Sequence, residues 1–146
     1  MKLRTSLAAA GAAVVLGTTG ALVLPAVASA HSSTHTLKFI AVQKGMVNFS
    51  STTAGIQETD QNATGKTIGF DVLYFNVTSS SSAAVNATID TKGGFLYGTF
   101  NVNLKTGALT NGKVTGGTGA FKGATGTITA KTISSTKHAV TITYSG

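Results

Sequence analysis

The stretch Val114–Gly126, VTGGTGAFKGATG, decides the fold of this 146-residue chain. It is a glycine-dense segment between two β-like runs near the C-terminus. Glycine adopts positive φ and lets two backbones approach closely, so the segment predicts a sharp bend with Phe121 packed at one end of the domain. It does not resemble a nucleotide-binding loop, because a β-branched strand follows it and not a helix. The predicted turn residues are Gly116, Gly117, Gly119, Phe121, Gly123 and Gly126.

The residues on both sides of this turn favour strands. After residue 30 the chain has one Glu, no Arg and no Pro, and it is rich in Thr, Val, Ile, Gly, Ser and Asn. β-Branched runs separated by Gly, Asn and Ser clusters are typical of strands and tight turns. Residues 54–66, which carry Glu58 and Asp60, are predicted to be a polar, solvated loop. The predicted strands are residues 37–43, 47–53, 67–78, 84–91, 95–104, 108–116, 124–133 and 138–144.

Seven or eight short strands predict an all-β fold, either a sandwich or a barrel. Several runs are apolar on both alternating faces, which a sheet with one wet face would not show. The chain also has no cysteine to staple a small fold. Barrel closure removes exposed sheet edges without disulfides. The prediction is therefore a closed antiparallel β-barrel of about eight strands.

The N-terminus has the pattern of a helical secretory signal peptide. Lys2 and Arg4 precede an apolar run over residues 7–24, and Ala28-Ser29-Ala30 is a small-residue cleavage site. Cleavage would leave a chain beginning at His31, so secretion to the extracellular space is expected. A retained membrane anchor is the alternative, since the run is close to the length that spans a bilayer. The predicted organisation is a signal peptide over 1–30, a flexible segment over 31–36 and a single barrel domain over 37–146, with no membrane span after cleavage.

The charge of the secreted part favours solubility over nucleic-acid binding. Removing Lys2 and Arg4 leaves nine lysines and four acidic residues, a balance of 9 − 4 = +5. The lysines are dispersed, and arginine, which clamps phosphates and guanine edges, is absent. Weak attraction to an anionic wall or membrane surface stays open. Without cysteine, zinc–thiolate sites, iron–sulfur clusters and cysteine nucleophiles are excluded.

The glycine string resembles the allene oxide cyclase barrel and dirigent protein superfamily. Allene oxide cyclases carry a similar VTGGSG-x-F-x-G-x-x-G string, and dirigent proteins carry VVGGTG-x-F-x-x-A-x-G. Ile68-Gly69 opening a long strand and the terminal strand 138–144 are compatible, so the likeness extends over residues 67–146. It is strongest to small secreted members from actinobacteria. The resemblance implies an eight-stranded antiparallel barrel whose cavity holds a hydrophobic small molecule, with no cofactor.

The acid–base residues of that superfamily are not at matching positions. Allene oxide cyclases have a glutamate and an asparagine in the first strand, where this chain has the apolar run 39–42. Dirigent proteins have an aspartate near the end of that strand, where Gln43 is the nearest polar residue. The dirigent arginine before the last glycine of the string falls on Thr125. A cofactor-free cyclase, isomerase or dirigent-type activity is therefore an open question.

Asp71 is the candidate catalytic residue. It lies inside an apolar run on the same alternating face as Leu73 and Phe75, and a carboxyl group inside a barrel would have a raised pKa. An outward aspartate bonded to lysine is the alternative. His35 and His138 are interpreted as surface histidines, and no metal site is predicted because His31 and His35 would need an ordered segment. The predicted ligand-binding residues are Phe39, Asp71, Leu73, Phe75 and Tyr97.

Two main functions remain open from the sequence, beside a third possibility, lysine-mediated binding of an anionic wall polymer, which would show a steep salt dependence. In the first, the barrel binds a hydrophobic small molecule and guides its cyclisation or coupling by shape, which requires positioning more than strong acid–base groups. In the second, it is a non-enzymatic secreted carrier or cell-surface interaction module. An interior lined with a carboxylate and aromatic rings favours the first, and an interior filled by side chains favours the second. The sequence allows a homo-oligomer without fixing its size.

Overall fold

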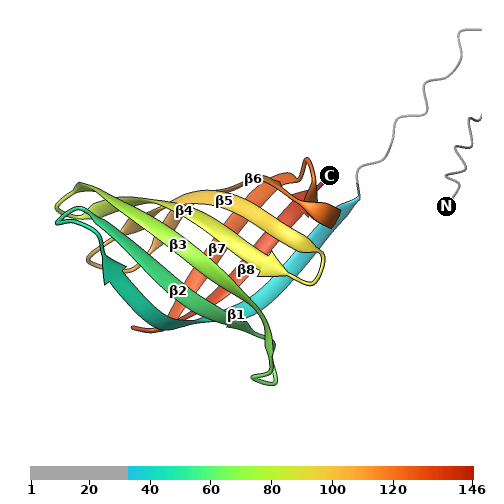
Figure 1. The fold of residues 1–146 in the computed structure, drawn as a ribbon, viewed down its shortest axis with the longest axis horizontal. Coiled ribbons are helices and arrows are strands. Elements are labelled where there is room, and N and C mark those ends of the chain that lie inside the picture. Colours follow the sequence, from blue (N-terminus) through green and yellow to red (C-terminus); the bar gives the residue numbers. More distant parts are fainter. Residues whose placement is uncertain (1–32) are drawn as a thin grey trace, which may run out of the picture. The chain divides into compact units, whose positions relative to one another are not determined.

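A computed structural model describes residues 33–146, which form eight strands and one short 3-10 helix (Figure 1). Each strand pairs antiparallel with the next, and β8 pairs with β1, so the sheet closes into a barrel. The predicted signal peptide and His31 lie outside the described residues. Within residues 33–146, no helix is long and apolar enough to cross a membrane. The elements are β1 (Thr34–Asn48), β2 (Thr53–Gln61), β3 (Thr67–Ser79), β4 (Ser82–Thr91), β5 (Gly94–Asn103), β6 (Leu109–Gly117), η1 (Gly119–Phe121), β7 (Thr125–Ser134) and β8 (Lys137–Ser145).

Alternation along the strands separates the barrel interior from its surface. In β4, Val85, Ala87 and Ile89 are buried, while Asn86 and Thr88 between them are exposed. Successive strand residues point to opposite faces, so the buried set forms the inner wall and the polar set faces water. The closed antiparallel barrel of about eight strands predicted from the sequence is confirmed.

Three predictions differ from the structure at the start of the barrel. Residues 47–53, expected to be a strand, hold the turn between the end of β1 at Asn48 and the start of β2 at Thr53. Residues 34–36, expected to be flexible, belong to β1, where Thr34 pairs with Ser145 and His35 with Tyr144. Residues 54–61, expected to be a polar loop, are most of β2, which pairs with β1 and β3. The prediction of a loop here was wrong, because polar residues were assumed to face water.

The glycine string closes one end of the barrel. The N–H of Thr118 donates to the Phe95 carbonyl at 2.8 Å, and the N–H of Ala120 donates to the Gly93 carbonyl at 2.9 Å. These bonds hold η1 across the β4–β5 turn. Phe121 is buried with 6% of its surface exposed and meets Tyr144 edge-on, with ring centroids 5.4 Å apart. Phe121 therefore packs at the barrel end, as the sequence predicts.

Gly119 has the strictest requirement for glycine in this turn. Its φ is +58°, and a Cβ atom there would collide with the carbonyl oxygen of Gly93. Gly123, four residues on, also has a positive φ of +80°, but a Cβ atom there would meet nothing within 4 Å. Alanine at Gly123 would therefore introduce backbone strain alone, whereas alanine at Gly119 would introduce both strain and a steric collision.

Replacing Gly119 with alanine is expected to destabilise the fold more than replacing Gly123 with alanine. Gly123→Ala carries only the cost of a left-handed alanine, about 1–2 kcal/mol. Gly119→Ala adds the collision with the Gly93 carbonyl. Urea denaturation of both variants would measure the difference. Equal losses of stability would mean that the Gly93 contact does not constrain the turn.

The ladder of paired residues between β6 and β7 is the shortest in the barrel. These strands are joined through two residue pairs, Lys113 with Thr127 and Val114 with Gly126. The ladder between β7 and β8, by contrast, runs from the Thr125–Ser145 pair to the Ser134–Lys137 pair. The first half of β6 therefore lies beside β7 without ladder pairing to it.

Candidate functional site

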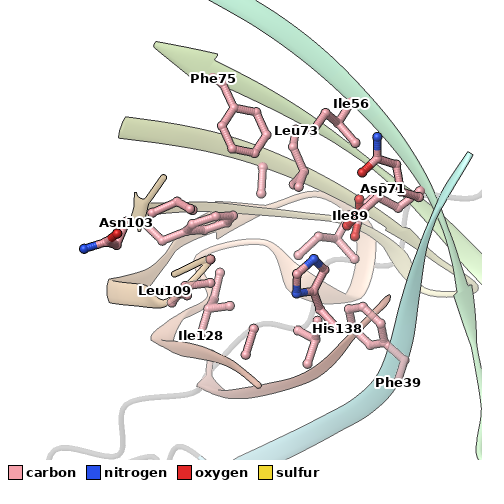
Figure 2. A pocket seen from close by; sticks show the side chains of 18 of the residues that line it. Phe39, Ile56, Asp71, Leu73, Phe75, Ile89, Asn103, Leu109, Ile128 and His138 are labelled. Carbon is pink, nitrogen blue, oxygen red and sulfur yellow. The ribbon is translucent and has the colours of Figure 1, made fainter. Parts of the chain in front are cut away.

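A cavity of about 360 Å³ lies inside the barrel, toward the end opposite η1. The apolar part of its wall comes from side chains of all eight strands (Figure 2). Residues of the β5–β6 and β7–β8 turns, including Leu104, Gly107 and Ser135, line the outer end. The size and the apolar lining suit a small organic molecule. The apolar and aromatic lining residues are Phe39, Ile56, Leu73, Phe75, Ala87, Ile89, Phe100, Val102, Leu104, Leu109, Ile128, Ala130 and Val140.

Three acidic side chains gather at the inner end of this cavity. Glu58 of β2 stands directly opposite Asp71 of β3 in the strand pairing, and both line the cavity. Asp60, two residues after Glu58, points to the same interior face. Their exposed fractions are 5% for Glu58, 2% for Asp60 and 3% for Asp71. Like charges directly opposite each other destabilise a sheet, so this arrangement costs the fold stability. We call these three residues the acid cluster.

Small neighbours make room for the acid cluster. Asp60 is paired with Ala41 on β1 and with Gly69 on β3. A Cβ atom on Gly69 would meet the Asp90 carbonyl oxygen and would lie 3.5 Å from Asp60 Oδ2. Ala41 is fully buried. Asp60 therefore occupies a niche that larger side chains at these two positions would fill.

Burial raises the pKa of every member of the acid cluster. Desolvation, followed by the charges of Glu58 and Asp60, raises the pKa of Asp71 to about 9. Desolvation and the charge of Glu58 raise the pKa of Asp60 to about 7. Desolvation also raises the pKa of Glu58, against a hydrogen bond from Asp71 and the charge of His138. Asp71 is thus the proton-bearing member, able to donate a hydrogen bond to either neighbour.

His138 faces the acid cluster from β8. It lines the cavity and is half-buried, and its charge acts on the pKa of Glu58. Figure 2 shows that its ring and Asp71 both point into the cavity. Its interpretation as a surface histidine was therefore wrong. The cavity end thus combines three carboxyl groups with one imidazole, the side chains that most often transfer protons in enzymes.

Four of the five predicted ligand-binding residues share the cavity wall. Phe39, Asp71, Leu73 and Phe75 all line it. Tyr97 does not: it lies on the outer face of β5 with 38% of its surface exposed. Leu96 and Phe100 are the inward residues of this strand. The placement of Tyr97 was wrong because β5 carries large apolar residues on both faces, so alternation alone does not say which face is inside.

Sequence reasoning missed Glu58, Asp60 and His138. A signal for the first two was present, because Ile56, Glu58 and Asp60 recur every second residue, as one face of a strand does. A similar signal existed for His138, because it shares one alternating face of β8 with Val140 and Ile142. In the part of the chain that the structure describes, no group of three or more His, Asp or Glu side chains is arranged to hold a metal ion.

Comparisons with known proteins identify the fold but not a family. The sequence matches no protein-family model and shows no significant match to a curated protein. Among solved structures, a pyocyanin demethylase aligns with a TM-score of 0.59 at 16% identity, over 75% of this chain and 99% of that one. AbnU, an exo-specific intermolecular Diels-Alderase, aligns with a TM-score of 0.63 at 10% identity, over 78% of this chain and 99% of that one. The chain therefore has the fold of small barrel proteins that include enzymes acting on small molecules.

Proposed function

We propose that this barrel binds a hydrophobic small molecule in its cavity and guides the cyclisation or coupling of that molecule. One observation carries the proposal: a buried acid cluster stands at the inner end of an apolar cavity of about 360 Å³. Buried carboxyl groups with strongly raised pKa values concentrate at functional sites, since they cost stability and are retained for another reason. The apolar wall would hold the ligand in one folded conformation, and the acid cluster would anchor its polar end.

The alternative function, a non-enzymatic carrier or surface module, receives less support. A carrier of a neutral hydrophobic molecule needs an apolar cavity but gains nothing from Glu58 facing Asp71 inside it. The Diels-Alderase with the same fold also favours a role in ring formation. The glycine string, together with the eight-stranded barrel that it closes, supports membership of the allene oxide cyclase and dirigent superfamily. Export of the chain with cleavage before His31 is part of the same proposal.

Native mass spectrometry of the protein from its host's culture medium tests this proposal. We expect the mass of a chain that begins at His31, together with the additional mass of a retained small molecule of low polarity. Leu73→Trp should remove that molecule, because Leu73 lines the cavity and the larger indole would fill it. The matched control is Tyr97→Ala, which changes an outward residue and should leave the molecule bound.

Two results would contradict the proposal. A protein that is free of ligand and takes up nothing from a metabolite extract would leave the cavity without a function. A bound molecule that survives Leu73→Trp but is lost in Tyr97→Ala would place the binding site on the outer face of β5. Loss of the molecule in Leu73→Trp must be accompanied by an unchanged circular dichroism spectrum, so that unfolding is not mistaken for a filled cavity.

A further inference from the structure

The acid cluster contains hydrogen-bond acceptors without donors. Among the described residues, Oδ1 of Asp71 and Oδ1 of Asp60 are buried and have no hydrogen-bond partner. Asp71 has 3% of its surface exposed and lines the cavity. Buried polar atoms in folded proteins are nearly always paired, and an unpaired acceptor costs stability. A donor is therefore missing at the inner end of the cavity.

The charges around the acid cluster are also unbalanced. Among residues 33–146, His138 is the only basic side chain in the cavity lining, and all nine lysines between Lys38 and Lys137 are exposed. The other residues facing the acid cluster across the strand pairing are Gln43 and Ala41 on β1, Gly69 on β3 and Ile89 on β4, none of them charged. Asp90 of β4 adds a further negative influence on Asp60. The inner end thus sets three carboxyl groups against one imidazole, and it also lacks a donor for Asp71 and Asp60.

We propose that the ligand of this cavity carries a protonated nitrogen, whose N–H donates to Oδ1 of Asp71 while its charge faces Glu58. This inference rests on the proposed binding function and names the class of ligand: a hydrophobic amine or another basic nitrogen compound. The apolar body of the ligand lies against Leu73, Phe75 and Phe100, toward the β5–β6 turn. Hydrogen bonds between charged groups are about twice as strong as neutral ones, so the nitrogen dominates recognition.

Other ligand classes satisfy only part of the site. A neutral alcohol supplies the missing donor but not a positive charge. A carboxylate or phosphate supplies neither and meets three acidic groups. A metal ion needs several ligands arranged around one point, and the described side chains do not offer that arrangement. A basic nitrogen on an apolar body supplies the donor, the charge and the hydrophobic contact together.

Binding of such a cation releases protons from the acid cluster. The groups that titrate around the ligand are Glu58, Asp60 and Asp71 on β2 and β3 and His138 on β8, with Asp90 nearby. A positive charge lowers the pKa of each neighbouring carboxyl group, so the affinity for the cation rises with pH. A neutral ligand of the same shape has no such dependence. The pH profile therefore separates charge recognition from hydrophobic fit.

The test titrates the full chain with three probes of the same size: 1-naphthylmethylamine, 1-naphthalenemethanol and 1-naphthoate. We expect the amine to bind at least about tenfold more tightly than the alcohol at pH 7.5, with the naphthoate weakest. The affinity for the amine should fall at pH 6.0, while that for the alcohol stays constant. Calorimetry gives the affinities, and the protons released at pH 7.5 appear as a dependence of the heat on the buffer.

Variants assign the effect to the acid cluster. Asp71→Asn should bring the amine and the alcohol within about threefold of each other, because it removes both the charge and the proton release. Glu58→Gln is the second variant, in case Asp71→Asn changes the fold. Asp90→Asn is the matched control: it removes the same kind of charge outside the cavity lining and should keep the preference for the amine.

The outcomes distinguish this inference from the proposed function. Equal binding of amine and alcohol overturns the basic-nitrogen inference and leaves a hydrophobic ligand in place. Tightest binding of the naphthoate overturns it as well. A preference for the amine that survives in both Asp71→Asn and Glu58→Gln moves the recognition elsewhere and also overturns it. If none of the probes binds and none displaces a retained natural ligand, the binding function itself fails.

Discussion

Replacing Asp71 with asparagine is expected to increase the free energy of unfolding by at least about 2 kcal/mol at pH 8. The pKa of Asp71 is raised to about 9 in the folded barrel, from an ordinary value of 3.8. Between these two values the folded state holds a proton that the unfolded chain releases. The stability of the natural protein therefore falls as the pH rises from about 4 to about 9, and Asp60 adds to the fall up to about pH 7.

Asparagine removes this dependence at position 71, because it is neutral at every pH and its amide can still donate to Glu58 and Asp60. At pH 4 the two proteins should differ little, since Asp71 is then protonated in the folded state and about half protonated in the unfolded state. Urea denaturation at pH 4, 6 and 8 gives the comparison. Asp90→Asn is the control and should not flatten the profile. A loss of stability in Asp71→Asn that is the same at all three pH values would contradict the raised pKa.

Truncating Phe121 to alanine is expected to destabilise the barrel by about 3–5 kcal/mol. Phe121 is 6% exposed, packs edge-on against Tyr144, and forms part of the buried core with Leu96 and Ile142. Its removal leaves a cavity at the closed end that η1, fixed by hydrogen bonds to the β4–β5 turn, cannot collapse to fill. The loss therefore includes a cavity contribution as well as the lost transfer of the ring from water.

The control for this measurement is Phe95→Ala, which removes the same ring from the outer face of β5, where 39% of it is exposed. That change should cost clearly less, because solvent can occupy the space. Chemical denaturation of both variants decides the matter. Similar losses would mean that the glycine turn closes the barrel through its backbone alone.

The barrel architecture could be predicted from the sequence because its signals are local. β-Branched runs, hairpin turns and the absence of cysteine point to closed antiparallel strands, and the glycine string marks the end that Phe121 fills. That Asp71, Leu73 and Phe75 share one face of β3 also followed from their alternation, although the opposite face is apolar as well. These inferences need only neighbouring residues along one strand.

The acid cluster could be predicted only in part, because its polar residues are buried, whereas polar residues usually face water. Glu58 and Asp60 look like loop residues until the pairing of β2 with β3 places Glu58 opposite Asp71. Tyr97 was misplaced for a related reason: both faces of β5 carry large apolar residues, and register decides between them. In each case a contact between strands supplied the missing information. A single strand cannot supply it, and functional sites are where local rules are most often broken.

The short ladder between β6 and β7 affects how large a ligand the barrel accepts. Leu109 on β6 and Ile128 and Ala130 on β7 line the cavity, yet the ladder between these strands is limited to residues 113–114 and 126–127. Outside those residues no ladder pairs β6 with β7, and regions with few backbone hydrogen bonds open at the lowest free energy. The cavity volume of about 360 Å³ therefore describes the barrel before any such opening. We therefore expect the barrel to widen first on this side, without breaking any of its longer ladders, and its selectivity to depend on chemistry at the acidic end more than on a fixed diameter.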